Sequence, residues 1–380
     1  MRFADVIGQQ AVVQKLRTAI SVGRLPNAFL LLGAEGYGSL PLALAMTRYI
    51  QCAQRGEDEA CGTCPSCLKN AKLQHPDVLY IYPNNSAGDS HTGSSQDFLA
   101  QWRKAVLDDP YLSLDGWRNA LGVANKKCII NVRDSAVVIN ALSYRPYEAR
   151  MRMVIIYLAE HMNDQTANKL LKSLEEPPNG TMFILTAESA DHILPTILSR
   201  VQTVRLARPT DAAVEAALVQ RAVVQPTVAR RIAHMAGGNV RVAMDLAHDS
   251  TLFEDPTRFF IAWMRAAYAM NVEEVANLSE EFAKWGRETQ RVFLTQALGT
   301  LRKVLLKPTG TLPPDAVLPD EEEFLRKFAP FINSSNAGRI ATEMDRAAYH
   351  IERNGAGRII FTDLTLSIAD ALREAALQRA

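Results

Sequence analysis

A short apolar run, 28–32 (Ala-Phe-Leu-Leu-Leu), ends directly at a glycine-rich turn, 33–38, and a helical pattern follows from Pro41 to Gln51. A continuous apolar run of this length is typical of a strand buried on both faces of a parallel sheet. A strand, a glycine loop and a helix in this order open a nucleotide-binding α/β unit. This feature constrains the fold most, because parallel strands require helical crossovers.

Further apolar runs at 127–132, 151–158 and 181–186 predict three more strands, and helical patterns such as 165–176 separate them. We therefore expect an α/β domain over 1–205, with a parallel sheet covered by helices on both faces. Short helical patterns broken at Gly237-Gly238 predict a small helical lid over 206–250. A C-terminal helical domain over 256–380 should follow, interrupted by a Pro/Gly-rich stretch at 308–319. We assign no function to the Asn/Ser/Gly-rich segment 84–96.

The charges of the chain nearly balance, with 42 Lys and Arg against 41 Asp and Glu among 380 residues. A net charge of +1 gives no overall basic field to attract nucleic acid or an acidic membrane, so any DNA contact must be local or shared with partners. No apolar run approaches the ~20 residues that span a bilayer. The N-terminus lacks the apolar core of a signal peptide. We expect a cytoplasmic protein with no membrane contact.

Four of the five cysteines, Cys52, Cys61, Cys64 and Cys67, lie close together in the sequence, and Cys128 stands apart. Two overlapping C-x-x-C spacings suit a tetrahedral site for a metal that prefers thiolates, so zinc or an iron–sulfur cluster fits. Four sulfur ligands leave no open position for water, which favours a structural role. Zinc is the favoured metal, and iron–sulfur stays open. A redox motif and four unrelated buried thiols are the weaker interpretations.

The glycine turn has the frame G-x-x-x-x-G-K-[ST] of a phosphate-binding loop, with candidate cofactor-binding residues Gly33, Gly36, Gly38 and Ser39. Two positions of this motif carry residues that cannot bind phosphate or Mg²⁺ as the motif does. Ser39 replaces the lysine that reaches the β- and γ-phosphates, and Leu40 replaces the hydroxyl that ligates Mg²⁺. Losing one charged hydrogen bond costs about 1.5–3 kcal/mol.

The acidic partner of the metal is also missing, because Tyr157-Leu158 follows the apolar run 154–156 where Asp-Glu would be expected. The sequence therefore lacks both the lysine that would bind the phosphates and the hydroxyl and carboxylate that would hold Mg²⁺. The sequence predicts a nucleotide-binding fold kept as a scaffold, which neither binds nor hydrolyses ATP.

Several separated motifs occur in the order found in one family. They are Phe3-Ala-Asp-Val-Ile-Gly-Gln9, the four-cysteine cluster, His75-Pro76-Asp77, Thr166-Ala-Asn-Lys-Leu-Leu-Lys-Ser-Leu-Glu-Glu-Pro-Pro178, Thr181-Met-Phe-Ile-Leu-Thr186 and Ile193-Leu-Pro-Thr-Ile-Leu-Ser-Arg200. Over residues 1–250 the chain resembles the bacterial DNA polymerase III clamp-loader subunits of the AAA+ class. The C-terminal third is similar only in being helical.

The degenerate phosphate loop with an intact Ser-Arg motif resembles the non-hydrolysing member of that family. The resemblance implies that Arg200 acts in trans, as an arginine finger on ATP bound by a neighbouring subunit. It also implies a hetero-oligomeric ring with other loader subunits, joined by the C-terminal domain as a collar, and a sliding clamp and primer-template DNA as partners of the ring. Val201 departs from the family's usual cysteine. Arg241 resembles the lid arginine that senses nucleotide, here a relic or a contact between lid and core.

Two other functions remain as alternatives. One is a working ATPase that compensates for its altered phosphate loop. The other is a zinc-ribbon protein that binds nucleic acid, which is disfavoured because Leu68 to Tyr82 contains only two basic residues, Lys69 and Lys72. We interpret Glu175-Glu176 as helix-end charges before a double proline. His75 and His161 are interpreted as structural, because four thiols complete a metal shell.

Overall fold

The computed structural model divides into two compact units, Met1–Ala243 and Met244–Ala380, which are described separately. The predicted division at 205 and 250 differs from these bounds and stays a prediction. The structure describes residues 1–23, 25–85, 93–123, 126–221, 224–248, 256–306, 319–333, 336–353 and 355–377.

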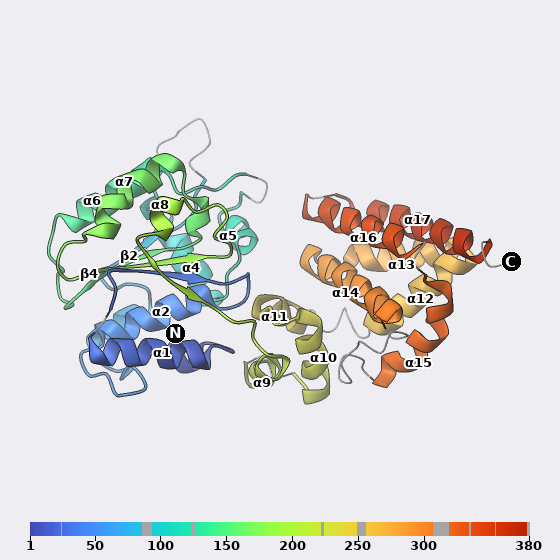
Figure 1. Ribbon diagram of the computed structural model, residues 1–380, viewed down its shortest axis with the longest axis horizontal. Coiled ribbons are helices and arrows are strands. Elements are labelled where there is room, and N and C mark those ends of the chain that lie inside the picture. Colours follow the sequence, from blue (N-terminus) through green and yellow to red (C-terminus); the bar gives the residue numbers. More distant parts are fainter. Residues whose placement is uncertain are drawn as a thin grey trace. The chain divides into compact units, whose positions relative to one another are not determined.

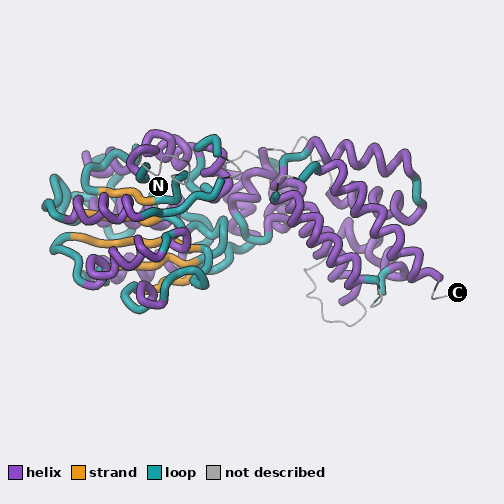
Figure 2. Tube along the Cα trace, turned by 90° about the horizontal axis from the view of Figure 1, so that it is seen from above, coloured by secondary structure: helices purple, strands orange, loops and turns teal. Residues whose placement is uncertain are grey.

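The first unit is built on a five-stranded sheet in the order β2-β3-β4-β1-β5, in which every neighbouring pair is parallel. Leu30 lies opposite Leu185 and Val154 lies opposite Phe183 in the register. The strands, orange in Figure 2, are β1 (Ala28–Leu32), β2 (Val78–Ile81), β3 (Arg152–Ile156), β4 (Thr181–Ala187) and β5 (Gln202–Arg205).

Helices cover both faces of this sheet, since successive strand residues point to opposite sides. Phe29 and Leu31 pack into the core beneath α1 (Gln10–Val22) and α2 (Ser39–Gln51). The alternate residues of the same strand pack beneath α6 (Val132–Leu142) and α7 (Asp164–Glu175). Figure 1 shows these two helix pairs on opposite sides of the sheet. The expected α/β architecture, a parallel sheet with helices on both faces, is confirmed.

The predicted strand at 127–132 is wrong. Ile129 and Ile130 make only isolated bridges, to Asn84 and Met162, and Val132 already begins α6. The run is apolar because Cys128 and Ile130 are fully buried. Strands β2 and β5 take its place in the sheet, and the sequence patterns did not identify them.

The first unit also contains shorter helices. They are η1 (Phe3–Asp5), α3 (Pro65–Ala71), η2 (Ser95–Phe98), α4 (Leu99–Asp108), α5 (Leu114–Ala120), η3 (Ala159–His161) and α8 (Pro195–Leu198). Part of the polar segment 84–96, residues 86–92, lies outside the described residues. Its two ends are tied to the buried Asp134, which accepts hydrogen bonds from the Asn84 amide (3.1 Å) and the Ser95 hydroxyl (2.8 Å).

Three helices follow β5, as the sequence predicts for 206–250. They are α9 (Asp211–Arg221), α10 (Pro226–Ala236) and α11 (Val240–His248). Gly237 ends α10 in the left-handed conformation, which is the usual place of glycine after a helix.

The second unit is helical throughout its described residues. Its core is aromatic: the rings of Trp263 and Phe361 lie 4.8 Å apart and those of Phe282 and Phe361 lie 4.4 Å apart. Trp263 Nε1 donates to the buried Thr365 hydroxyl at 2.7 Å. The helices are α12 (Pro256–Ala269), α13 (Val272–Lys284), α14 (Arg287–Leu306), α15 (Pro319–Phe328), α16 (Ala337–Glu352) and α17 (Gly357–Leu377), with the short η5 (Ala329–Phe331).

Most of the Pro/Gly-rich stretch, 308–318, lies outside the described residues. Within the part of the chain that the structure describes, none of the helices has the length and apolarity needed to cross a membrane.

Candidate functional site

The glycine-rich loop 33–40, called the phosphate-type loop below, is held in place by polar contacts from distant segments. It begins where β1 ends, and Gly36 and Gly38 adopt positive φ angles of 78° and 91°. The Gln9 side-chain amide donates to the carbonyl oxygens of Tyr37 (3.0 Å) and Ala207 (2.6 Å). The loop is therefore fixed to the N-terminal segment and to the chain that leaves β5.

The pocket beside this loop lacks the basic side chains that bind a triphosphate. The described residues that line it are Glu35, Gly36, Gly38, Ser39, Leu40, Pro41, Tyr111, Leu112, Tyr157, Leu158 and Glu188. This lining contains two carboxylates and neither lysine nor arginine. The enclosed space holds about one water molecule. The described lining therefore offers a polyanion no positively charged side chain, where a phosphate loop normally provides a lysine.

Two buried tyrosines, Tyr111 and Tyr157, line the pocket. Tyr157, at the carboxyl end of β3, donates its hydroxyl to the Leu112 carbonyl oxygen at 2.6 Å. Burial raises the pKa of Tyr157 well above its usual range, so the phenol stays neutral and cannot replace a carboxylate on Mg²⁺. Tyr111 accepts the Ile7 backbone N–H at 2.8 Å, and its ring lies over Gly38.

The start of α11 and the residue before it, Asn239, contact the phosphate-type loop directly. The Val240 N–H donates to the Gly36 carbonyl oxygen (3.2 Å), and the Asn239 amide donates to Glu35 Oε1 (3.4 Å). A Cβ at position 36 would overlap with the Asn239 side chain, so glycine is needed there for close approach as well as for its φ angle. Arg241 forms an ion pair with Asp109, which places a lid arginine on the core.

Arg200 follows α8 by two positions, and its guanidinium contacts both α7 and α8. Its Nε donates to Glu175 Oε2 at 2.8 Å, and its Nη1 donates to the Thr196 carbonyl oxygen at 2.9 Å. The Arg200 side chain keeps 30% of its exposure and that of Glu175 keeps 57%. The sequence interpretation of Glu175 as a helix-end charge missed this ion pair.

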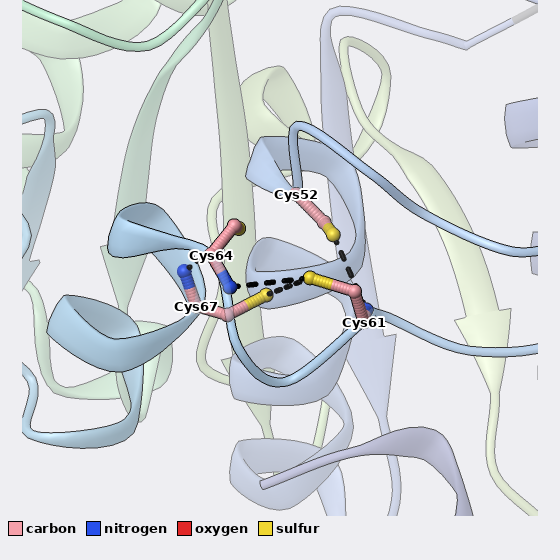
Figure 3. Close-up of side chains that lie close together, drawn as sticks. All are labelled: Cys52, Cys61, Cys64 and Cys67. Carbon is pink, nitrogen blue, oxygen red and sulfur yellow. Dashed lines mark hydrogen bonds between the residues drawn. The ribbon is translucent and has the colours of Figure 1, made fainter.

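The four clustered cysteines do come together. Cys52 follows α2, Cys61 lies in the next loop, and Cys64 and Cys67 begin α3. Their ligand atoms all lie within 4.8 Å of one another, and the Sγ atoms of Cys61 and Cys67 are 3.9 Å apart. Four thiolates at about 2.3 Å around a tetrahedral zinc would be about 3.8 Å apart. Figure 3 shows the four side chains gathered between the two helices.

Backbone N–H groups donate to these sulfur atoms and so favour their thiolate form. The N–H groups of Cys61 and Cys64 donate to Cys52 Sγ and Cys61 Sγ, both at 3.3 Å, and the N–H of Cys67 donates to Cys64 Sγ at 3.4 Å. The N–H groups of Cys64 and Thr63 lower the pKa of Cys61 to about 6. Burial raises the pKa of Cys67 to about 12, and a bound cation would offset that cost. The cluster can therefore hold a metal ion.

The two histidines lie among structural contacts. His75 Nδ1 accepts the Asp77 N–H at 3.1 Å, and its Nε2 lies 3.4 Å from Glu148 Oε1. Burial lowers the pKa of His75 and of His161, so both rings are neutral at pH 7.

Comparison with known proteins identifies the family. The model of the family described as DNA polymerase III, delta subunit, matches residues 8–210. The chain belongs to this family, and the resemblance carried by its motifs is confirmed.

Its relatives are subunits of the same polymerase. The delta' subunit of DNA polymerase III from Bacillus subtilis strain 168 is 28% identical over 246 residues, which cover 65% of this chain and 61% of the relative. A gamma/tau subunit from Mycobacterium bovis is 29% identical over 198 residues, or 52% of this chain and 27% of the relative. The chain thus spans less than two thirds of either relative.

Among solved structures, a gamma subunit-related protein of DNA polymerase III from Thermotoga maritima matches with a TM-score of 0.43 and 15% identity. The match covers 95% of this chain and 99% of that one.

Proposed function

We propose that this chain is a non-hydrolysing, delta'-like subunit of a DNA polymerase III clamp loader, the assembly that places a sliding clamp on primer-template DNA. Its direct partners are the other loader subunits of a hetero-oligomeric ring. The observation that supports this most is the pocket beside the phosphate-type loop, where the charged lining residues are Glu35 and Glu188.

The lid contacts support the same conclusion. In a working ATPase the nucleotide phosphates bind between the loop and positive side chains. Here Asn239 and Val240 bond to the loop itself, and Arg241 pairs with Asp109. These contacts tie the loop and the core to residues of the chain itself. We therefore interpret Arg241 as a lid–core contact.

Arg200 is the residue through which such a subunit would act. We propose that its guanidinium faces the γ-phosphate of ATP held by a neighbouring subunit and stabilises the charge that develops during hydrolysis. Arginine fingers of this kind contribute about 10³–10⁵ to the rate in GTPase systems. Zinc at Cys52, Cys61, Cys64 and Cys67 would stabilise the fold between α2 and α3, with no part in the reaction.

The experiment is a titration of the purified chain with a fluorescent ATP analogue and Mg²⁺, from micromolar to millimolar concentrations. An ATP-hydrolysing subunit of the same loader, with an intact phosphate loop, is the positive control. We expect no saturable binding to this chain. Tight binding that depends on Mg²⁺ would overturn the non-hydrolysing assignment and favour a compensated ATPase.

A further inference from the structure

The guanidinium of Arg200 is held on two of its three nitrogens. Nε donates to Glu175 Oε2 at 2.8 Å, and Nη1 donates to the Thr196 carbonyl oxygen at 2.9 Å and approaches the Ser199 hydroxyl at 3.4 Å. Within the described residues, Nη2 makes no such contact. Because a guanidinium is planar, fixing Nε and Nη1 also fixes the direction in which the donors of Nη2 point.

The fold sets the distance between the two side chains. Leu174 and Ile197 are both buried in the same core cluster, and this packing joins α7 to α8. Pro177-Pro178 ends α7, because a proline excludes the helical conformation from the residue before it. Glu175 is therefore the last residue of α7 and faces the residue that follows α8 by two positions.

We propose that Glu175 is a positioning residue for Arg200, which orients the guanidinium so that Nη2 is presented to an anionic oxygen on a neighbouring subunit. This inference rests on the proposed function, in which that oxygen belongs to the γ-phosphate of ATP. Glu175 itself does not touch the nucleotide. Its ion pair already restricts the rotation of the long Arg200 side chain, so this conformational entropy need not be lost at the moment of reaction.

This ion pair is suited to orientation and contributes little to folding. Ion pairs as exposed as this one stabilise proteins weakly, so the melting temperature should hardly depend on it. Glu176 provides a matched control. It is the neighbouring exposed glutamate, and within the described residues its carboxylate makes no hydrogen bond or ion pair.

The experiment measures ATP turnover by the ring reconstituted from this chain and its partner subunits, with a sliding clamp and primed DNA. Four variants are compared with the unaltered chain: Arg200→Ala, Glu175→Ala, Glu175→Gln and Glu176→Ala. We expect Glu175→Ala to lower kcat by about 3- to 30-fold, the range that the side-chain freedom of one arginine can account for. The KM for ATP and ring assembly should stay unchanged.

Glu175→Gln should restore most of the turnover, because its amide oxygen still accepts from Nε, and Glu176→Ala should match the unaltered chain. If Arg200→Ala lowers turnover but Glu175→Ala does not, the positioning role is wrong and the finger remains. A rise in turnover with Glu175→Ala would also overturn it, since Glu175 would then restrain the finger. If Arg200→Ala itself has no effect, the proposed function and this inference both fail.

Discussion

The cysteine cluster gives a prediction whose size follows from the fold. Cys67 is fully buried and its Sγ lies 3.9 Å from that of Cys61, so Cys67→Ser removes one ligand from the centre of the site. We expect this variant to lose its bound zinc. The cluster joins α2, which begins at the phosphate-type loop, to α3, so a metal bound there would stabilise the first unit of the chain.

Binding to the folded state alone stabilises a protein by about 1.4 kcal/mol for each tenfold rise in free ligand above Kd. For a unit as long as Met1–Ala243, one kcal/mol shifts Tm by about 2–4 °C. The Tm of the first unit should therefore rise by about 3–6 °C for each tenfold increase in free Zn²⁺ above Kd. The Cys67→Ser variant should show no such dependence.

The assay is differential scanning calorimetry in buffers of fixed free Zn²⁺, with metal analysis of the purified chain. Cys128→Ser is the matched control, because Cys128 is equally buried but lies outside the cluster. The control should keep one zinc per chain and the same dependence of Tm. A Tm independent of zinc in the unaltered chain would refute the site. Iron and a visible absorption band would show a cluster in place of zinc.

Two further changes test the first unit. Burial alone would raise the pKa of the Asp77 carboxylate, but the N–H groups of residues 147–149 outweigh burial and lower it. The ionised carboxylate therefore stabilises the folded state above the unfolded pKa near 3.8, and this stabilisation is lost as pH falls through the folded pKa. Asp77→Asn should therefore cost about 2–3 kcal/mol at pH 7 and less at pH 3, measured by urea unfolding; an equal cost at both pH values would contradict this. Ser39→Lys combined with Leu40→Thr should not create ATP binding in calorimetric titration, because Tyr157 still stands where Mg²⁺ needs a carboxylate; micromolar binding would contradict the account of the pocket.

The strands that the sequence predicted correctly are the ones buried on both faces. In β1, β3 and β4 every residue is buried, so each appears as a continuous apolar run. Strand β5, Gln202–Arg205, lies at the sheet edge with mostly exposed polar side chains, and β2 has only four residues. Neither offers a pattern long enough to recognise. The run 127–132 misled for the opposite reason, because burial made an irregular segment apolar.

In the candidate site, the sequence revealed the features that lie within a short stretch and missed the contacts between distant segments. The cysteine cluster and the altered residues of the phosphate-type loop were visible because each lies within a short stretch of sequence. The contact of Asn239 with Glu35 joins segments 204 residues apart, and the ion pair of Arg200 with Glu175 joins the end of α7 to the turn after α8. Such contacts depend on how the elements pack, which spacing along a single chain does not reveal.

The most direct test of the central claim is ATP turnover by the reconstituted ring, with Arg200→Ala in place of the unaltered chain. If this subunit supplies its arginine in trans, kcat should fall by about 10³ or more while the partner subunits still bind ATP and the ring still assembles. Unchanged DNA-stimulated turnover in a correctly assembled ring would contradict the account.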